Sequence, residues 1–528
     1  MSSVLASPSP WPGLPLGFLG DVDPAYPDET EMNALLCGMA EIGRGKSYLA
    51  WSEYRSVTVM FDRLVAARED TDGFVVDGFA DCAARISKVQ GITQRRAEVL
   101  LSEAVALRDR LPAVFDCLRD GVIAPWQAQL VIARTDLLDG CASALDVDAE
   151  IAALLRGRTG SWSRKRLRDM CDRIVYRHDP DAVRERRKHA LDDRGVWTDP
   201  REDGTATITG LMSAENVQIA AAAVSALADT ACEHDGRTQP QRASDAMFAL
   251  LSGTAFECQC GRVDCTAQIP EPGTIPPVDA KIVLHVVCDE GTLAGTKANA
   301  GYMDGHGVIS AEHVRDIAAR PDTTIKPLVP NGTEPDDDDG TFTLPAHLPS
   351  DPYRPSSALD TFVRVRDGIC ADPGCEVSAW RGDMEHVAEF DHADPARGGQ
   401  TDAENMNVKC RLDHLRKTFG EWLDDQWRDD DGRLRTEFIT PEGLVIPGEA
   451  ETNEDLFPGL RRIRFSAPAQ GPPRRPHLNG RDHDEDGEHR GEDRPTRARP
   501  RVENKHARRR AERYRNRRRR NTDGDAPF

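Results

Sequence analysis

Apolar residues recur three and four positions apart through much of the first half of the chain. Ala97, Leu100, Leu101, Ala104 and Leu107 follow this spacing, which would place them on one face of a helix. Similar Ala- and Leu-rich windows extend from about residue 29 to residue 251. The pattern predicts a domain built from packed helices.

Proline and glycine predict where several of these helices begin and end. Proline is favoured in the first turn of a helix, and glycine just after the last turn. The expected helices cover residues 93–110, 114–118, 125–134, 214–232 and 242–251. The β-branched, apolar run 281–288 instead predicts a buried strand. We therefore expect a mainly α domain with a minor β part over residues 29–320.

Other segments lack a helical pattern and divide the rest of the chain. Residues 1–28 are rich in Pro, Ser and Gly, and 321–357 combine Pro and Gly with a run of Asp. Such compositions cannot bury a core, so we expect a disordered lead-in and a flexible acidic linker. Residues 358–447 form a compact segment, and residues 467–528 a disordered, highly charged tail.

Composition narrows the class of protein. The 528 residues carry a net charge of −21, and no apolar run approaches the roughly 20 residues of a membrane span. The first twenty residues lack the basic start and unbroken apolar core of a secretion signal. We expect a cytoplasmic protein without a membrane partner. Thirteen cysteines are too dilute for a disulfide scaffold, so clustered cysteines indicate metal binding.

Two segments are strongly basic in spite of the overall acidity. Residues 161–188 lie in helical pattern and are interpreted as a solvated helix face that pairs with acids, with phosphate contact as the alternative. Residues 505–520 contain a single acid, Glu512, and such an arm adheres to polyanions through counterion release. We expect the arginines of this arm to bind nucleic acid: Arg508, Arg509, Arg510, Arg517, Arg518, Arg519 and Arg520.

The metal ligands of the compact segment are closely grouped. Cys370 and Cys375 flank the turn-forming residues ADPG and can present both sulfurs to one ion. Cys410 supplies a third sulfur, and Asp413 or His414 would follow it on a helix as the fourth ligand. The spacing predicts a structural zinc site.

A second set of polar residues lies between these cysteines. Glu385 adjoins His386, and Asn405 and His414 follow. A carboxylate and a distant imidazole can hold a divalent ion while the adjacent imidazole takes a proton from water. This arrangement is suited to phosphodiester hydrolysis.

This order of Glu-His, Asn and His inside a cysteine knuckle resembles the HNH endonuclease family, and the likeness extends through Gly398, Gly399 and Thr401. The resemblance implies a small α+β domain with the ββα-metal fold. It implies His386 as general base, Asn405 as the brace of the loop, and His414 with Glu385 as ligands of the catalytic ion. Cys370, Cys375 and Cys410 would hold zinc, and the catalytic ion would be Mg²⁺ or Mn²⁺.

The chain departs from this family at the start of the helix that follows Cys410. Zinc-bearing members usually have two adjacent histidines, and here the first is Asp413. Either Asp413 gives an oxygen to zinc, or His414 is drawn to zinc and the catalytic ion loses a ligand. Asp391 and His392 form a competing carboxylate-histidine pair, retained as a second choice.

The long helical region in front of this motif resembles bacterial proteins that join domain of unknown function 222 to an HNH domain. The likeness is carried by residues 104–112, 236–246, 305–309 and 353–355. No mechanism follows from it, so targeting, inhibition, self-association and protein binding stay open as roles of the helical domain.

Another cysteine group lies within the helical region. Cys258, Cys260 and Cys265 are close in sequence, with Cys232, His234, His285 and Cys288 at a distance. The group suggests either a zinc knuckle or a cysteine-rich loop, because no fourth ligand is local in the sequence.

Taken together, these patterns favour a metal-dependent DNA endonuclease. Lys417 and the arginine-rich arm would contact DNA. The alternatives are an inactive, zinc-stabilised module that binds DNA or protein, and a protein-interaction function of the helical domain alone.

Overall fold

The computed structural model describes residues 29–67, 78–158, 160–201, 204–272, 285–320, 323–392, 394–468 and 514. Within this part of the chain there are two compact units. The first combines the chain up to His178 with the chain from Ala318, and the second spans Asp179–Ile317. The expected lead-in of residues 1–28 and the arginine-rich arm lie outside the described residues, except for Tyr514.

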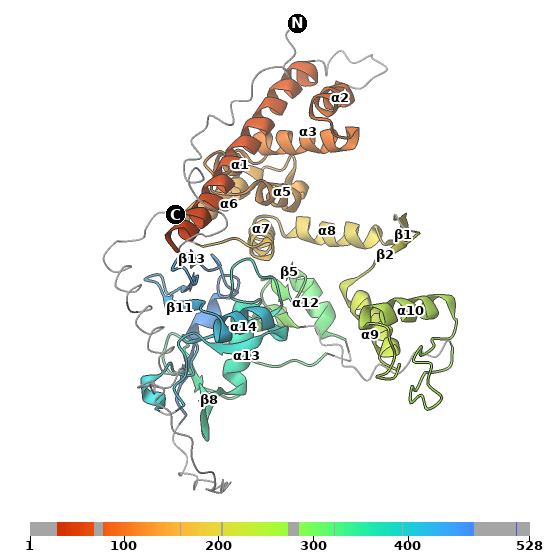
Figure 1. Cartoon of the computed structure of the whole chain (residues 1–528). Helices are drawn as coiled ribbons and strands as arrows, with labels where there is room; N and C mark the ends of the chain where they lie inside the picture. The colour runs from red at the N-terminus through yellow and green to blue at the C-terminus, as the bar shows by residue number, and fades with distance from the viewer. Residues whose placement is uncertain are drawn as a thin grey trace, which may run out of the picture. The chain divides into compact units, whose positions relative to one another are not determined.

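The first unit begins with packed helices, most of them labelled in Figure 1. Their bounds are α1 (Glu29–Leu64), α2 (Gly78–Gln90), α3 (Gln94–Asp109), α4 (Pro112–Arg119), α5 (Pro125–Arg134), α6 (Ala144–Gly157) and α7 (Arg164–His178). Leu101, Leu107 and Ile151 are among the fully buried side chains, so the predicted apolar stripe of α3 is confirmed as a core face. A helical N-terminal region is therefore confirmed.

The helix starts follow the expected chemistry. Thr93 precedes α3, and its hydroxyl accepts a hydrogen bond from the backbone N–H of Arg96 at 3.2 Å. Pro112 and Pro125 occupy the first turns of α4 and α5, where proline costs no backbone hydrogen bond. The helix predicted over 125–134 has the observed bounds of α5.

The second unit contains both helices and small antiparallel sheets. Its elements are α8 (Pro180–Asp192), β1 (Gly195–Pro200), β2 (Ala206–Leu211), α9 (Ala214–Ala228), α10 (Gln239–Ser252), β3 (Val286–Val287), α11 (Glu290–Leu293), β4 (Gly301–Met303), β5 (Gly307–Ile309) and α12 (Ala311–Ala318). β1 pairs with β2, and β4 lies between β3 and β5. Of the strand predicted over 281–288, residues 285–288 are described, and β3 covers only Val286 and Val287 of them.

The chain from Ala318 adds a mixed α/β module to the first unit. Its elements are β6 (Phe342–Pro345), β7 (His347–Leu348), β8 (Asp351–Pro355), α13 (Ser357–Asp367), β9 (Asp383–His386), β10 (Met406–Lys409), α14 (Arg411–Phe419), β11 (Leu423–Arg428), β12 (Leu434–Ile439), β13 (Val445–Pro447) and β14 (Ile463–Ser466). β9 and β10 are antiparallel, as are β11, β12 and β13. We call residues 342–466 the C-terminal module.

This module differs from the expected division into a linker and a domain of residues 358–447. β14 pairs in parallel with β6, and the rings of Phe362 and Phe465 lie 5.1 Å apart. The strand pairing therefore brings residues 342–345 and 463–466 into the folded module. Strands of four residues flanked by Pro, Gly and Asp carry too little alternation to be recognised in sequence.

The basic stretch 161–188, interpreted as a solvated helix face that pairs with acids, does pair with acids, but it is not one solvated face. The stretch divides into α7 and α8 at Pro180, and Lys165 and Arg166 of α7 are buried. The Arg166 guanidinium donates to Asn453 Oδ1 at 3.0 Å and to the Asp367 carbonyl. Arg173 pairs with Glu451 at 2.9 Å. Basic residues of α7 thus bind the C-terminal module.

In the described part of the chain, every helix is too short or too polar to cross a membrane.

Removal of the Arg166 guanidinium is expected to destabilise the first unit. Arg166→Ala leaves a buried carbonyl and a buried amide without their charged donor, at a cost of about 2 to 4 kcal/mol. Urea unfolding of the full chain measures this loss. Arg164→Ala, on the exposed start of α7, is the control. Equal stability of the two variants would contradict the role of Arg166 in holding α7 against the C-terminal module.

We expect the contact between Glu215 and His313 to stabilise the second unit less in acid. Their side chains meet at 3.1 Å. Burial acts to raise the pKa of Glu215, but hydrogen bonds from its own backbone N–H, His313 and Ser213 lower it to about 2. Because the folded pKa lies below the unfolded value of about 4.3, the contribution is present above that value and is lost as pH falls toward 2.

Glu215→Gln is therefore expected to destabilise the second unit by about 1 to 2 kcal/mol at pH 6, with a smaller difference below pH 4. Thermal unfolding of wild type and variant across this range measures it. A difference that is independent of pH would contradict the assigned role.

Candidate active site and metal centres

The polar residues predicted between the cysteines lie on a strand-strand-helix element. β9 and β10 pair so that Glu385 is opposite Asn407 and His386 is opposite Met406. α14 begins directly after β10, with Cys410 as its N-cap, and contacts both strands. The arrangement of two antiparallel strands followed by a helix is the one that the sequence resemblance implied.

A fully buried arginine holds β10 in place. Arg366, near the end of α13, donates to the carbonyls of Ala403 and Met406 at 2.5 and 2.8 Å. Its Nε donates to Asp367 Oδ1 at 2.7 Å, and Asp367 Oδ2 accepts the backbone N–H of Val408 at 2.9 Å. The start of β10 is thereby fixed against α13.

Asn405 joins the two ends of the loop between the strands. Its Oδ1 accepts the backbone N–H of Ala388 at 2.7 Å, and its Nδ2 donates to the carbonyls of Ala388 and Gln400 at 3.0 and 2.8 Å. A Cβ on Gly399 would lie 2.0 Å from the Ala388 carbonyl oxygen. Glycine is required for this close approach, and Asn405 then braces the loop.

His414 lies between two carboxylates of β9. Its Nδ1 is 2.7 Å from Asp383 Oδ2, and its Nε2 is 3.1 Å from Glu385 Oε2. Asp383 and Glu385 are two residues apart on one strand and therefore share a face. Sequence reasoning missed Asp383, although the Asp-x-Glu spacing on a strand before a histidine was the available signal.

The hydrogen bonds of His386 determine its tautomer. Its Nε2 lies 2.8 Å from Thr401 Oγ1, and this hydroxyl lies 2.6 Å from the Pro352 carbonyl oxygen. A carbonyl can only accept, so the single hydroxyl proton goes to Pro352 and Nε2 of His386 must donate to Thr401. The neutral imidazole then carries its lone pair on Nδ1.

His386 is held neutral by its surroundings. Burial, followed by the charges of Lys417 and His392, lowers its pKa to about 4, and only 6% of the residue is exposed. The ring of Tyr353, on β8, stacks on the imidazole at a centroid distance of 5.2 Å. The contact with Tyr353 was not foreseen, because β8 lies in the expected linker.

Lys417 does not lie where a surface contact to DNA requires it. The residue is 2% exposed, and its Nζ donates to the carbonyls of His386 and Val387. It also pairs with Asp424 at 2.9 Å and with Glu385 at 3.3 Å. The prediction of a phosphate-binding Lys417 is corrected, because α14 directs this side chain into the module.

The four residues expected to bind structural zinc lie together. One ligand atom each from Cys370, Cys375, Cys410 and Asp413 lies within 4.8 Å of the others. Asp413 Oδ2 accepts from Cys410 Sγ at 3.0 Å. Three sulfurs and one oxygen at this spacing suit a closed tetrahedral zinc site.

The sequence left open whether Asp413 or His414 would join the three sulfurs. In the structure Asp413 lies beside the sulfurs, and His414 lies beside Glu385. Adjacent positions on α14 point about 100° apart, so the helix serves both groups. A hydrogen bond with Cys370 lowers the pKa of the Cys375 thiol to about 6, whereas the pKa of Cys370 is raised.

The second-choice pair, Asp391 and His392, lies in a loop and not on a strand or helix. His392 is exposed, and its ring lies 4.7 Å from that of Tyr353. Asp391 Oδ1 accepts the backbone N–H of Asp394 at 3.1 Å. Both residues thus belong to the loop after β9.

Residues 52–367 match the family model described as domain of unknown function DUF222. The chain belongs to this family. The match starts within α1, covers α2 to α7, the whole second unit and the start of the C-terminal module, and ends at Asp367, before β9. The strand-strand-helix element of this DUF222 protein therefore lies outside the matched residues.

Similar proteins occur in Mycobacterium tuberculosis. The uncharacterized protein Rv2100 of strain H37Rv is 28% identical over 461 residues, which cover 80% of this chain and 78% of the relative. The uncharacterized protein Rv3776 is 27% identical over 435 residues, covering 80% and 79%. No solved structure matches this DUF222 protein.

Loss of the Cys375 thiol is expected to unfold the turn between Cys370 and Cys375 in the C-terminal module. Cys375→Ser should lower the zinc content by one ion per chain and the thermal midpoint by about 5 to 10 °C, since metal binding is coupled to folding. Elemental analysis and calorimetry measure both. Cys141→Ser, at an exposed cysteine outside both cysteine groups, is the control. An unchanged zinc content in Cys375→Ser would exclude this ligand set.

Proposed function

We propose that this DUF222 protein is a metal-dependent endonuclease of the HNH type that hydrolyses phosphodiester bonds in DNA. The observation that carries the proposal is His414 held between Asp383 and Glu385, with His386 next to Glu385 on β9 and hydrogen-bonded to Thr401. A general base, an imidazole ligand and a carboxylate ligand thus come from one small element.

Asp383 and Glu385 have different parts in this proposal. Asp383 accepts the Nδ1 proton of His414 at 2.7 Å, which fixes the ring and leaves Nε2 as the ligand atom. A carboxylate behind a ligating histidine is the usual support of a metal site. Glu385 then provides the oxygen ligand on the other side of the imidazole.

Mg²⁺ or Mn²⁺ between Nε2 of His414 and Glu385 would neutralise negative charge on the scissile phosphate and the leaving oxygen. The site's carboxylate and imidazole suit these ions.

His386 is the proposed general base. Its Nε2 proton is donated to Thr401, so Nδ1 has the lone pair that removes a proton from the attacking water. A pKa of about 4 keeps the imidazole neutral at pH 7. Thr401 and Asn405 act as positioning residues, because they orient the base and the loop that follows it.

The alternative is an inactive, zinc-stabilised module that binds DNA or protein. Lys417 favours it, since its ammonium lies 3.3 Å from Glu385 Oε1 and neutralises part of the charge that would attract a divalent ion. The burial of His386 to 6% exposure favours it as well.

Cleavage of supercoiled plasmid by the purified full chain distinguishes the endonuclease from the inactive module. Wild type is expected to cleave in Mg²⁺ or Mn²⁺ and not in EDTA. His386→Ala should lower the rate by about 10² to 10⁴, the usual contribution of a general base. His392→Ala tests the second-choice pair and is expected to keep the wild-type rate.

Equal cleavage by wild type and His386→Ala would indicate a contaminating nuclease and contradict the proposed base. Loss of cleavage in His392→Ala alone would move the base to the second-choice pair. An inert wild type that binds zinc and DNA would support the inactive module instead.

A further inference from the structure

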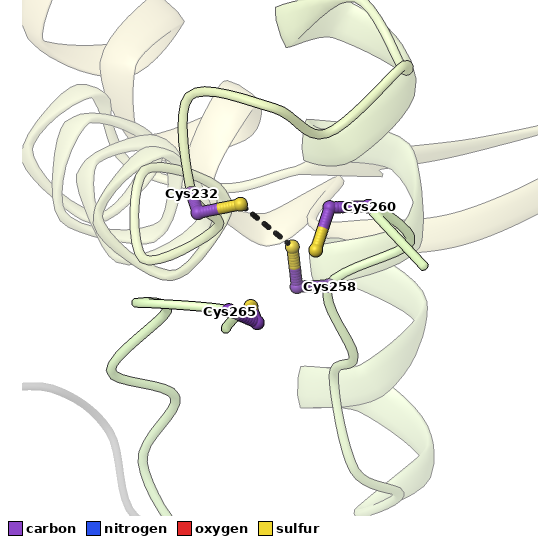
Figure 2. Close-up of side chains that lie close together, drawn as sticks. All are labelled: Cys232, Cys258, Cys260 and Cys265. Carbon is purple, nitrogen blue, oxygen red and sulfur yellow. Dashed lines mark hydrogen bonds between the residues drawn. The ribbon is translucent and has the colours of Figure 1, made fainter. Parts of the chain in front are cut away.

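A second group of thiols lies in the second unit, in the loops that follow α9 and α10. Cys232 comes four residues after the end of α9, and Cys258, Cys260 and Cys265 follow α10. One sulfur from each residue lies within 4.8 Å of the other three. Figure 2 shows the four side chains converging from these two loops. Cys232 is therefore the fourth ligand that the local sequence lacked.

The separation of the sulfurs fits a metal better than a disulfide. Cys232 Sγ and Cys258 Sγ are 3.5 Å apart, well beyond the roughly 2.05 Å of an S–S bond. Four sulfurs around zinc at about 2.3 Å lie about 3.8 Å from one another in a tetrahedron. The observed group is close to this arrangement.

The backbone around these cysteines forms a typical thiolate environment. The backbone N–H of Ala267 donates to Cys265 Sγ at 3.5 Å. The N–H groups of His234 and Arg262 likewise donate to Cys232 and Cys260. In each case the donor lies two residues after the cysteine, and amide donors stabilise the charged form of a thiol.

Polar contacts hold the two loops together independently of the sulfurs. Asp235 Oδ2 accepts the backbone N–H of Gln259 at 2.8 Å. Arg237 pairs with Asp235 and donates to the Glu257 carbonyl, both at 2.7 Å, and its guanidinium lies 5.2 Å from the centre of the Phe256 ring. The Asp235 side chain is fully buried. The loop that carries Cys258 and Cys260 is thus preorganised beside Cys232.

We propose that Cys232, Cys258, Cys260 and Cys265 bind one structural Zn²⁺ ion in the second unit. Four thiolates without an open position suit a closed zinc site rather than a catalytic one. The ion would tie the 254–272 loop to the end of α9. This site does not depend on the proposed nuclease, since its ligands come from a different unit.

Metal analysis of the purified full chain tests the site. Wild type is expected to contain two zinc ions per chain, and the double variant Cys260→Ser/Cys265→Ser one. Cys141→Ser is the control, with two ions expected. Trypsin digestion gives a second readout, because loss of this ion should expose the 254–272 loop to cleavage after Arg262.

A measurement on wild type avoids dependence on the folding of a variant. Cobalt exchanged into the chain should give absorption bands of a four-sulfur tetrahedral site, in addition to those of the site with three sulfurs and one oxygen. One zinc ion per chain that disappears in Cys375→Ser would overturn the second site and leave the proposed nuclease untouched. A Cys232–Cys258 disulfide, or iron in place of zinc, would also overturn it.

Discussion

The candidate active site depends on the buried guanidinium of Arg366. This group, with no exposed surface, satisfies the carbonyls of Ala403 and Met406 and pairs with Asp367. A buried charge is tolerated only when it is paired and fully hydrogen-bonded. Because Ala403 and Met406 lie just before and at the start of β10, the arginine holds this end of β10 against α13. β10 in turn pairs with β9, which carries Asp383 and Glu385.

The helix α14 contributes residues to both candidate metal sites. Cys410 and Asp413 face the thiols of the knuckle, and His414 faces Asp383 and Glu385. A structural ion on one side of so short a helix, of nine residues, would set the rotation of the helix and hence the position of His414. Because Asp413 and His414 point to different sides of α14, an aspartate among the sulfurs leaves His414 beside Glu385.

Local patterns in the sequence were sufficient for the helices and for the grouping of Cys370, Cys375, Cys410 and Asp413. Thr93, Pro112 and Pro125 mark helix starts through short-range chemistry, and the knuckle of Cys370 and Cys375 is likewise local. Contacts between distant segments were not accessible in this way. Tyr353 meets His386 through a short strand without clear alternation, and Cys232 joins cysteines 26 or more positions later only because two loops fold together. The burial of Lys417 also follows from packing rather than from composition.

The most direct test of the account is the location of a divalent ion in crystals of the full chain grown with Mn²⁺, by anomalous diffraction. The account predicts a manganese peak between His414 Nε2 and Glu385, with Nδ1 of His414 still bonded to Asp383. A chain without manganese at this position, in which the Lys417 ammonium remains paired with Glu385, would contradict a metal-dependent active site.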